Sequence, residues 1–293
     1  MTIGELLDEL ATELADPGVP PARALARDLI AGVVDQPRFW PTAHRAETLT
    51  PAAETSIRAA AARLRQGMPI QYAIGRASFR HLTLQVDRRV LIPRPETELL
   101  VDLVLAAQRG GRGTVIDVGT GSGAIALALA AEGAFDDVIA TDISPDALAV
   151  ARANLGAIPD GRRGAVRFVE GSLLAPFLGA DPDALPTIRA DTVVSNPPYI
   201  SLDEAAELPR LVHDWEPHGA LFAAEGGMAA IGALVPQAAR VLHPGGLLAL
   251  EIDARRATLA ADAVSKDGRF TDVETRPDLT GRPRFVVARR KEP

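Results

Sequence analysis

Short apolar runs alternate with helix-like segments from residue 113 to the end of the chain, and this alternation restricts the possible fold more than any other feature. Strands that are joined by crossover helices must run parallel. Strands are predicted at 114–119, 137–143, 165–171, 190–196 and 245–253, and a closing antiparallel pair at 270–278 and 284–290. The pattern predicts an α/β fold with a mainly parallel, seven-stranded sheet that helices cover on both faces.

The residues before this sheet have two other patterns. Apolar side chains recur at helical spacing within residues 1–66, which predicts a small helical bundle. Polar and apolar residues alternate within 79–92, which predicts a β-hairpin with its turn near Asp87–Arg89. The predicted domains are a helical domain at 1–75, a β-hairpin linker at 76–92 and an α/β domain at 93–293.

The composition narrows the possible functions. The chain of 293 residues has no cysteine, which excludes disulfides, zinc–thiolate sites and thiol catalysis. Its net charge of −7 argues against a protein whose main role is to grip a nucleic-acid backbone. The N-terminus lacks a signal-peptide pattern, and no apolar run reaches the roughly 18 residues of a membrane span. We therefore expect a cytoplasmic protein without direct nucleic-acid or membrane binding.

A glycine-rich loop follows the first strand of the predicted sheet. Gly119, Gly121 and Gly123 allow the backbone to turn sharply and to approach a ligand closely. The loop also fits the dinucleotide pattern G-x-G-x-x-G/A, and Asp142 lies where a ribose-binding carboxylate is expected. The loop alone therefore leaves NAD and S-adenosylmethionine open. Asp117 favours S-adenosylmethionine, because a carboxylate just before the loop repels a pyrophosphate but can hold a cationic amino-acid tail.

The predicted strand at 190–196 ends at a stiff corner, Asn-Pro-Pro-Tyr. Pro197 and Pro198 fix the backbone and keep their carbonyls as acceptors, and Asn196 adds a side-chain carbonyl. Two rigid acceptors suit one substrate NH₂ group, because they leave the nitrogen lone pair aimed at an electrophile. Tyr199 can pack on a flat substrate. In an open α/β sheet this corner, the glycine loop and Asp142 are expected to converge at the carboxyl edge.

Seven segments of the chain together resemble the HemK/PrmC family, the peptide chain release factor N5-glutamine methyltransferases. These segments are 67–75, 90–101, 116–130, 141–154, 193–201, 215–227 and 242–252, in that order. The most specific piece is IPRPETE at 92–98. The resemblance implies a class I, Rossmann-like methyltransferase fold with S-adenosyl-L-methionine as cofactor. It also implies that the substrate is the glutamine of the Gly-Gly-Gln loop in peptide chain release factors 1 and 2.

The resemblance also implies residue roles. The catalytic residues would be Asn196, Pro197 and Tyr199. The cofactor would be bound by Asp117, Gly119, Thr120, Gly121, Ser122, Gly123, Asp142 and Asn196. The substrate would be bound by Asn196, Pro197, Pro198 and Tyr199, with Arg94, Glu96 and Thr97 in the wall where the substrate loop docks. The helical domain would bind the substrate protein, and we expect a monomer without a metal site.

Three positions depart from the family pattern. Gly171, Ser172 and Leu173 stand where an acidic and a bulky residue are usual near the adenine, so a hydroxyl or backbone group must replace the carboxylate. Asp253 replaces a usual glycine, and Pro283 replaces a common acidic residue.

Other functions remain open. They are a glutamine methyltransferase that acts on a ribosomal protein, an N-P-P-Y amino-methyltransferase that acts on nucleic acid, and a non-catalytic NAD-binding module. The segment HDWEPH at 213–218 is a weak candidate for a metal site, because its spacing fits no helical i, i+4 pair of ligands. The family resemblance implies instead that this segment covers the substrate.

Catalysis is expected to come from positioning. The lone pair of an amide nitrogen is delocalised, and its proton is too weakly acidic for a side chain to remove first. We therefore predict no general base. The Asn196 side-chain oxygen and the Pro197 carbonyl would hold the two amide hydrogens and bind the nitrogen more tightly as it becomes cationic.

Overall fold

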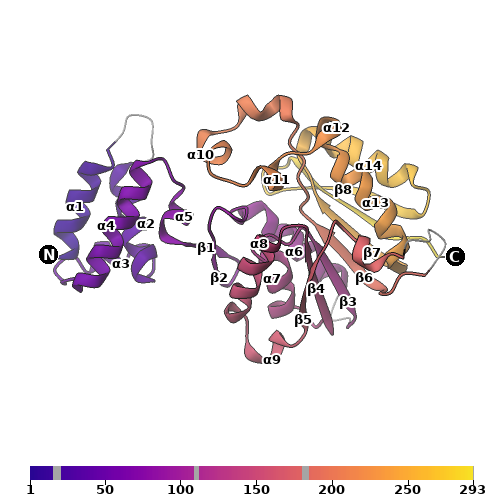
Figure 1. Cartoon of the computed structure of the whole chain (residues 1–293), viewed down its shortest axis with the longest axis horizontal. Coiled ribbons are helices and arrows are strands. Elements are labelled where there is room, and N and C mark those ends of the chain that lie inside the picture. The colour runs from indigo at the N-terminus through magenta and orange to yellow at the C-terminus, as the bar shows by residue number, and fades with distance from the viewer. Residues whose placement is uncertain (16–20, 109–111, 180–184, 293) are drawn as a thin grey trace. The chain divides into compact units, whose positions relative to one another are not determined.

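The computed structural model describes residues 1–15, 21–108, 112–179 and 185–292 (Figure 1). The chain forms two compact units, Met1–Arg76 and Ala77–Pro293. No helix in the described ranges is long and apolar enough to cross a membrane.

The first unit is a helical bundle with its own core, as the sequence predicts. Its helices are α1 (Ile3–Glu13), α2 (Ala22–Val34), α3 (Trp40–Ala43), α4 (Pro51–Arg65) and α5 (Ile70–Ile74). Thr2 caps α1 in a capping box with Glu5, and Thr50 caps α4. The apolar stripes of α1, α2 and α4 meet in a core that includes Leu6 and Ile57.

A hairpin follows, but its turn lies earlier than predicted. Strands β1 (Arg76–Phe79) and β2 (Leu82–Gln85) pair with each other, so the turn is at Arg80 and not near Asp87–Arg89. Arg80 has a φ of +52° and is held by Glu132, which accepts hydrogen bonds of 2.7 and 2.6 Å from its guanidinium. The predicted buried face is correct, since Leu82 and Leu84 are buried.

The second unit contains a seven-stranded sheet in the order β5-β4-β3-β6-β7-β9-β8. The strands are β3 (Thr114–Val118), β4 (Asp137–Asp142), β5 (Val166–Glu170), β6 (Ala190–Ser195), β7 (Leu242–Glu251), β8 (Phe270–Pro277) and β9 (Pro283–Arg290). Strands β3 to β7 run parallel, and β9 is antiparallel to both β7 and β8. The predicted fold class is therefore confirmed.

Helices pack on both faces of this sheet, as Figure 1 shows. One face is covered by α6 (Pro95–Gln108) and α7 (Ala124–Glu132), and the other by α13 (Ala229–Val241) and α14 (Ala257–Lys266). Alternating side chains serve the two faces: Val115 packs toward α6 and α7, and Ile116 toward α13 and α14. The remaining helices are α8 (Pro145–Ala153), α9 (Asp160–Arg163), α10 (Arg210–His213), α11 (His218–Leu221) and α12 (Ala224–Gly227). Short 3₁₀ helices occupy 154–157, 175–177, 202–207 and 254–256.

The strand register decides where the site lies. Val118 pairs with Thr141 on β4 and with Ser195 on β6, and Ser195 pairs with Leu250 on β7. The next residue on each of the four strands is therefore at the same level of the carboxyl edge. Those residues are Gly119, Asp142, Asn196 and Glu251.

Candidate active site

The glycine loop between β3 and α7 is open on its outer side. Gly119 and Gly121 have φ values of +75° and +55°, and a Cβ added to either would meet no atom of the described chain within 4 Å. The Gly119 and Thr120 N–H groups both donate to the Thr141 carbonyl at 2.9 Å, which ties the loop to β4. The loop is thus held to β4, and the space beside its two glycines is open to a ligand.

Two carboxylates support this cradle. Asp142 accepts hydrogen bonds of 2.9 Å from the Gly121 and Ser144 N–H groups, so it joins the loop to the start of α8. Asp117 is fully buried and accepts from the Thr120 hydroxyl at 2.6 Å and from the Ala126 N–H. Its Oδ1 finds no partner in the described part of the chain, and burial raises the pKa of Asp117 to about 7.

The corner at Asn196 is anchored to the same edge. The Ser195 hydroxyl donates to the Val118 carbonyl at 2.7 Å, which fixes the end of β6 beside the loop. Beyond the prolines, Ile200 donates to the Leu221 carbonyl at 3.0 Å. Pro197 is buried, whereas Asn196 and Tyr199 are half-buried. Burial and the charge of Glu251 raise the pKa of Tyr199 to about 12, so its phenol stays protonated at neutral pH.

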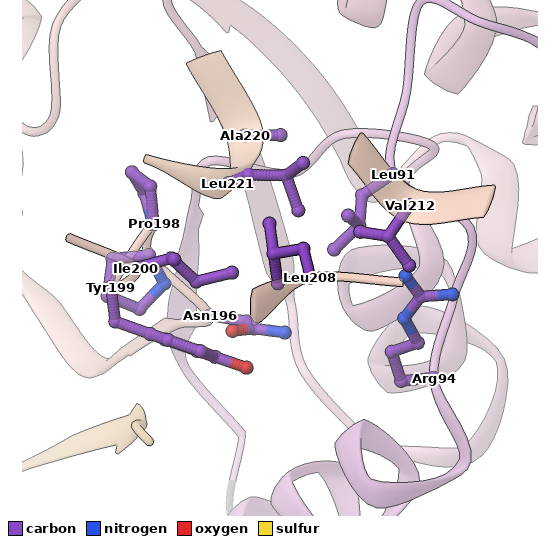
Figure 2. Close-up of a pocket in the computed structure, with 11 residues that line it drawn as sticks. Leu91, Arg94, Asn196, Pro198, Tyr199, Ile200, Leu208, Val212, Ala220 and Leu221 are labelled. Atoms are coloured by element: carbon purple, nitrogen blue, oxygen red, sulfur yellow. The ribbon is translucent and has the colours of Figure 1, made fainter. Parts of the chain in front are cut away.

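A cavity of about 200 Å³ opens beside this corner. Its polar wall consists of Asn196, Tyr199, Arg94 and the backbone at Pro197. In Figure 2, Asn196 and Tyr199 lie on one side of the cavity and Arg94 on the other. The rest of the lining is apolar, namely Leu91, Pro198, Ile200, Leu208, Val212, Ala220 and Leu221. Such a pocket suits a small side chain with one polar end.

The Arg94 guanidinium is paired at the rim of this cavity. Its Nη2 donates to both carboxylate oxygens of Glu216, at 2.7 and 2.8 Å. Glu216 is 4% exposed, and burial raises its pKa despite the nearby cation. The positive charge of Arg94 is therefore largely balanced, and the pair attaches segment 213–218 to the start of α6.

A second carboxylate lies behind Asn196. Glu251, the last residue of β7, is 1% exposed, and its Oε2 lacks a hydrogen-bond partner among the described residues. Burial raises the pKa of Glu251 to about 7, although hydrogen bonding by the Thr97 hydroxyl and the charge of Arg284 oppose this rise. The Asn196 Nδ2 donates to the same Thr97 hydroxyl at 3.3 Å.

The structure thus separates the residues that the sequence assigns to the site. Arg94, Asn196, Pro197, Pro198 and Tyr199 line one cavity. Thr97 is buried behind Asn196, and Glu96 is exposed outside the lining of this cavity. In the loop, Thr120 and Ser122 are buried, and a Cβ on Gly123 would lie 3.1 Å from Leu127.

Sequence reasoning missed Glu216 and Glu251 as partners of the site. Glu251 had a local signal, because a lone carboxylate ends the otherwise apolar run LLAL of a central strand. Glu216 had none, since its partner Arg94 is distant in the sequence.

A parallel sheet with an open glycine cradle and an Asn-Pro-Pro-Tyr corner at the same edge defines a class I methyltransferase. Two family models match the chain: the PrmC N-terminal domain at residues 5–75 and the Methyltransferase small domain at 95–213. A solved methyltransferase from Pyrococcus furiosus has the same fold, with a TM-score of 0.53 and 19% identity over 78% of this chain and 100% of that one.

Curated relatives are more similar. The release factor glutamine methyltransferase of Deinococcus radiodurans is 40% identical over 293 residues, which is 99% of each chain. The protein of the same name from Moorella thermoacetica is 38% identical over 100% of each chain. The chain belongs to the release factor glutamine methyltransferase family and is an enzyme that uses S-adenosylmethionine as its methyl donor. The open space beside Gly119 and Gly121 fits this cofactor, because a ligand can approach the loop backbone closely there, next to the Asp142 carboxylate that binds the loop.

Proposed function

We propose that this enzyme methylates the side-chain amide nitrogen, N5, of the glutamine in the Gly-Gly-Gln loop of peptide chain release factors 1 and 2. The names of the similar proteins support a release factor as substrate. The observation that carries the proposal is the cavity itself. Its lining is apolar apart from the Asn196 corner and an arginine whose charge Glu216 balances, so it favours an uncharged amide over a carboxylate or an ammonium group.

The residues of the corner would hold the substrate without removing a proton first. The Asn196 oxygen and the Pro197 carbonyl would each accept one amide hydrogen, which aims the nitrogen at the cofactor cradle. S-adenosylmethionine supplies an electrophilic methyl group when it is bound. As the nitrogen gains positive charge, the same two acceptors bind it more strongly, and this differential binding lowers the barrier. The methylated amide would then release its extra proton to water. Tyr199 stays protonated and packs beside the amide, so it does not act as a base.

Other residues would hold the cofactor. We assign the ribose hydroxyls to Asp142 and the amino-acid tail to the buried Asp117, with Gly119 to Gly123 as the backbone cradle. Ile143 is 70% exposed directly after Asp142. We assign Ile143 as an apolar surface that packs against the adenine. Such a contact can help hold the adenine in this protein, which has Ser172 where the family usually has an acidic residue. The helical domain, residues 1–75, would bind the body of the release factor.

Transfer of a labelled methyl group to purified release factor tests this function. The wild-type enzyme should label the native factor and leave a Gln→Ala variant of its Gly-Gly-Gln loop unlabelled. A variant with Gln→Glu at the same position should also stay unlabelled, because it has no amide nitrogen. Equal labelling of the native factor and the Gln→Ala variant would show that another residue is the acceptor.

A further inference from the structure

Three polar side chains, Asn196, Thr97 and Glu251, interact in sequence from the cavity into the sheet. Asn196 lies in the cavity wall and donates its Nδ2 to the Thr97 hydroxyl at 3.3 Å. Thr97 is 5% exposed, and Glu251 behind it is 1% exposed. These three side chains come from the start of α6, the residue after the end of β6 and the end of β7.

The direction of these hydrogen bonds follows from the groups available. An ionised carboxylate only accepts, and a hydroxyl has a single proton. With its proton turned toward Glu251, the Thr97 oxygen can only accept from Asn196. The side-chain amide of Asn196 must then turn its NH₂ group inward and its oxygen toward the cavity.

We propose that Glu251 is a positioning residue that acts through Thr97 to keep the Asn196 oxygen facing the substrate amide. This inference rests on the proposed function, because it concerns an acceptor for an NH₂ group. Without Glu251 the Thr97 proton is free to turn toward Asn196, and the amide can rotate. The Asn196 NH₂ group then faces the NH₂ group of the substrate amide. The two groups repel each other, and the cavity loses one of its two acceptors for the substrate.

Burial has the largest effect on the Glu251 carboxyl and raises its pKa to about 7, and the charge of Glu96 adds to this rise, whereas the Thr97 hydroxyl, Arg284 and Arg94 oppose it. The ionised form therefore prevails only above about pH 7. Below neutral pH a protonated Glu251 can itself donate to the Thr97 oxygen, so the hydrogen bonds no longer have one fixed direction from Asn196 to Glu251. Turnover should therefore rise as the pH increases through about 7.

Four variants test the proposal by turnover. Thr97→Val keeps the shape of the side chain and removes the hydroxyl. In Glu251→Gln, the side-chain amide can either donate a hydrogen bond to the Thr97 hydroxyl or accept one from it. Each should lower kcat about tenfold, which is about 1.4 kcal/mol. The double variant should be no slower than either single one, because both act through the same series of side chains. Thr97→Ser should recover most of the turnover that Thr97→Val loses. Glu274→Gln, an exposed change on β8, is the matched control.

Binding provides a readout that loss of structure would not move. Release factor with Gln→Glu in its loop carries two acceptor oxygens, so the wild-type cavity rejects it. A rotated Asn196 amide would donate to it, and the preference for the native factor over this variant factor should fall about tenfold in Thr97→Val and Glu251→Gln. Calorimetric titration with both factors measures this ratio, and S-adenosylmethionine binding should stay unchanged.

Two results can be told apart. If the wild-type enzyme does not label release factor, the proposed function fails. If it does, but the variants keep the wild-type preference and turnover, the role of Glu251 is wrong. A loss of turnover that is much larger in Glu251→Gln than in Thr97→Val would also overturn it, because it would point to direct participation of the carboxylate.

Discussion

The Arg94–Glu216 pair makes an asymmetric prediction for stability. Glu216 is 4% exposed, whereas the Arg94 side chain is 33% exposed. Replacing Arg94 by Met leaves a buried carboxylate without its cation, and such a loss typically costs about 3–5 kcal/mol. Glu216→Gln leaves a cation that water can reach, so we expect a cost of only about 1 kcal/mol. Urea unfolding followed by circular dichroism measures both differences.

The pH dependence gives the sharper test. Burial already raises the pKa of Glu216, and the loss of Arg94 removes the group that lowers it. A carboxyl whose folded pKa lies above its unfolded pKa stabilises the protein at low pH, and this contribution is lost as the pH rises through the folded pKa. The deficit of Arg94→Met should therefore be full at about pH 8 and should shrink toward about pH 5, where the carboxyl takes up a proton.

Two controls isolate the buried charge. Arg89→Met breaks an exposed pair with Asp87 and should change the free energy of unfolding by less than about 1 kcal/mol at either pH. The double variant Arg94→Met with Glu216→Leu removes both charges and should recover most of the loss. A deficit of Arg94→Met that is equal at both pH values, or no larger than that of Glu216→Gln, would refute the reasoning.

The remaining predictions concern the cofactor cradle and the corner. Asn196→Ala should lower kcat about 10²–10³-fold, with S-adenosylmethionine affinity by calorimetry changed far less. Gly121→Ala should cost about 1–2 kcal/mol of stability from its positive φ and should weaken S-adenosylmethionine binding at least tenfold, whereas Gly281→Ala has the same backbone strain and should leave binding intact. Burial raises the pKa of Asp117 to about 7, so the cofactor-free enzyme should lose stability as the pH rises through 7, and Asp117→Asn should lose less, as measured by thermal unfolding at pH 6 and 8.5.

Local signals explain why so much of the cofactor edge could be predicted. Prolines after Asn196 must end a strand, and glycines after Val118 must open a turn, whatever the rest of the chain does. The order of helices and strands then leaves few sheet topologies. The register between neighbouring strands is set by packing. Only the structure shows that this register brings Gly119, Asn196 and Glu251 to the same height at the carboxyl edge.

Long-range contacts explain the errors. The alternation from 82 to 86 correctly predicts which side chains are buried, but it does not locate the turn. Arg80 adopts a left-handed conformation because Glu132, on α7, and Glu98, on α6, hold its side chain and backbone. Long-range contacts also set the place of Thr97, which is buried with its hydroxyl accepting from Asn196, 99 residues away in the sequence.

The buried carboxylates of this edge have a common physical meaning. Asp117 precedes the end of β3 and Glu251 ends β7, so they lie on the two strands that flank β6 and its Asn196 corner. Each holds an oxygen without a partner in the described ranges, and burial raises the pKa of both to about 7. Such groups destabilise the cofactor-free site, because a buried carboxylate oxygen without a partner has lost its hydration. The roles proposed above explain why this edge keeps two such groups: Asp117 for the amino-acid tail of the cofactor, and Glu251 for the orientation of the Asn196 amide through Thr97.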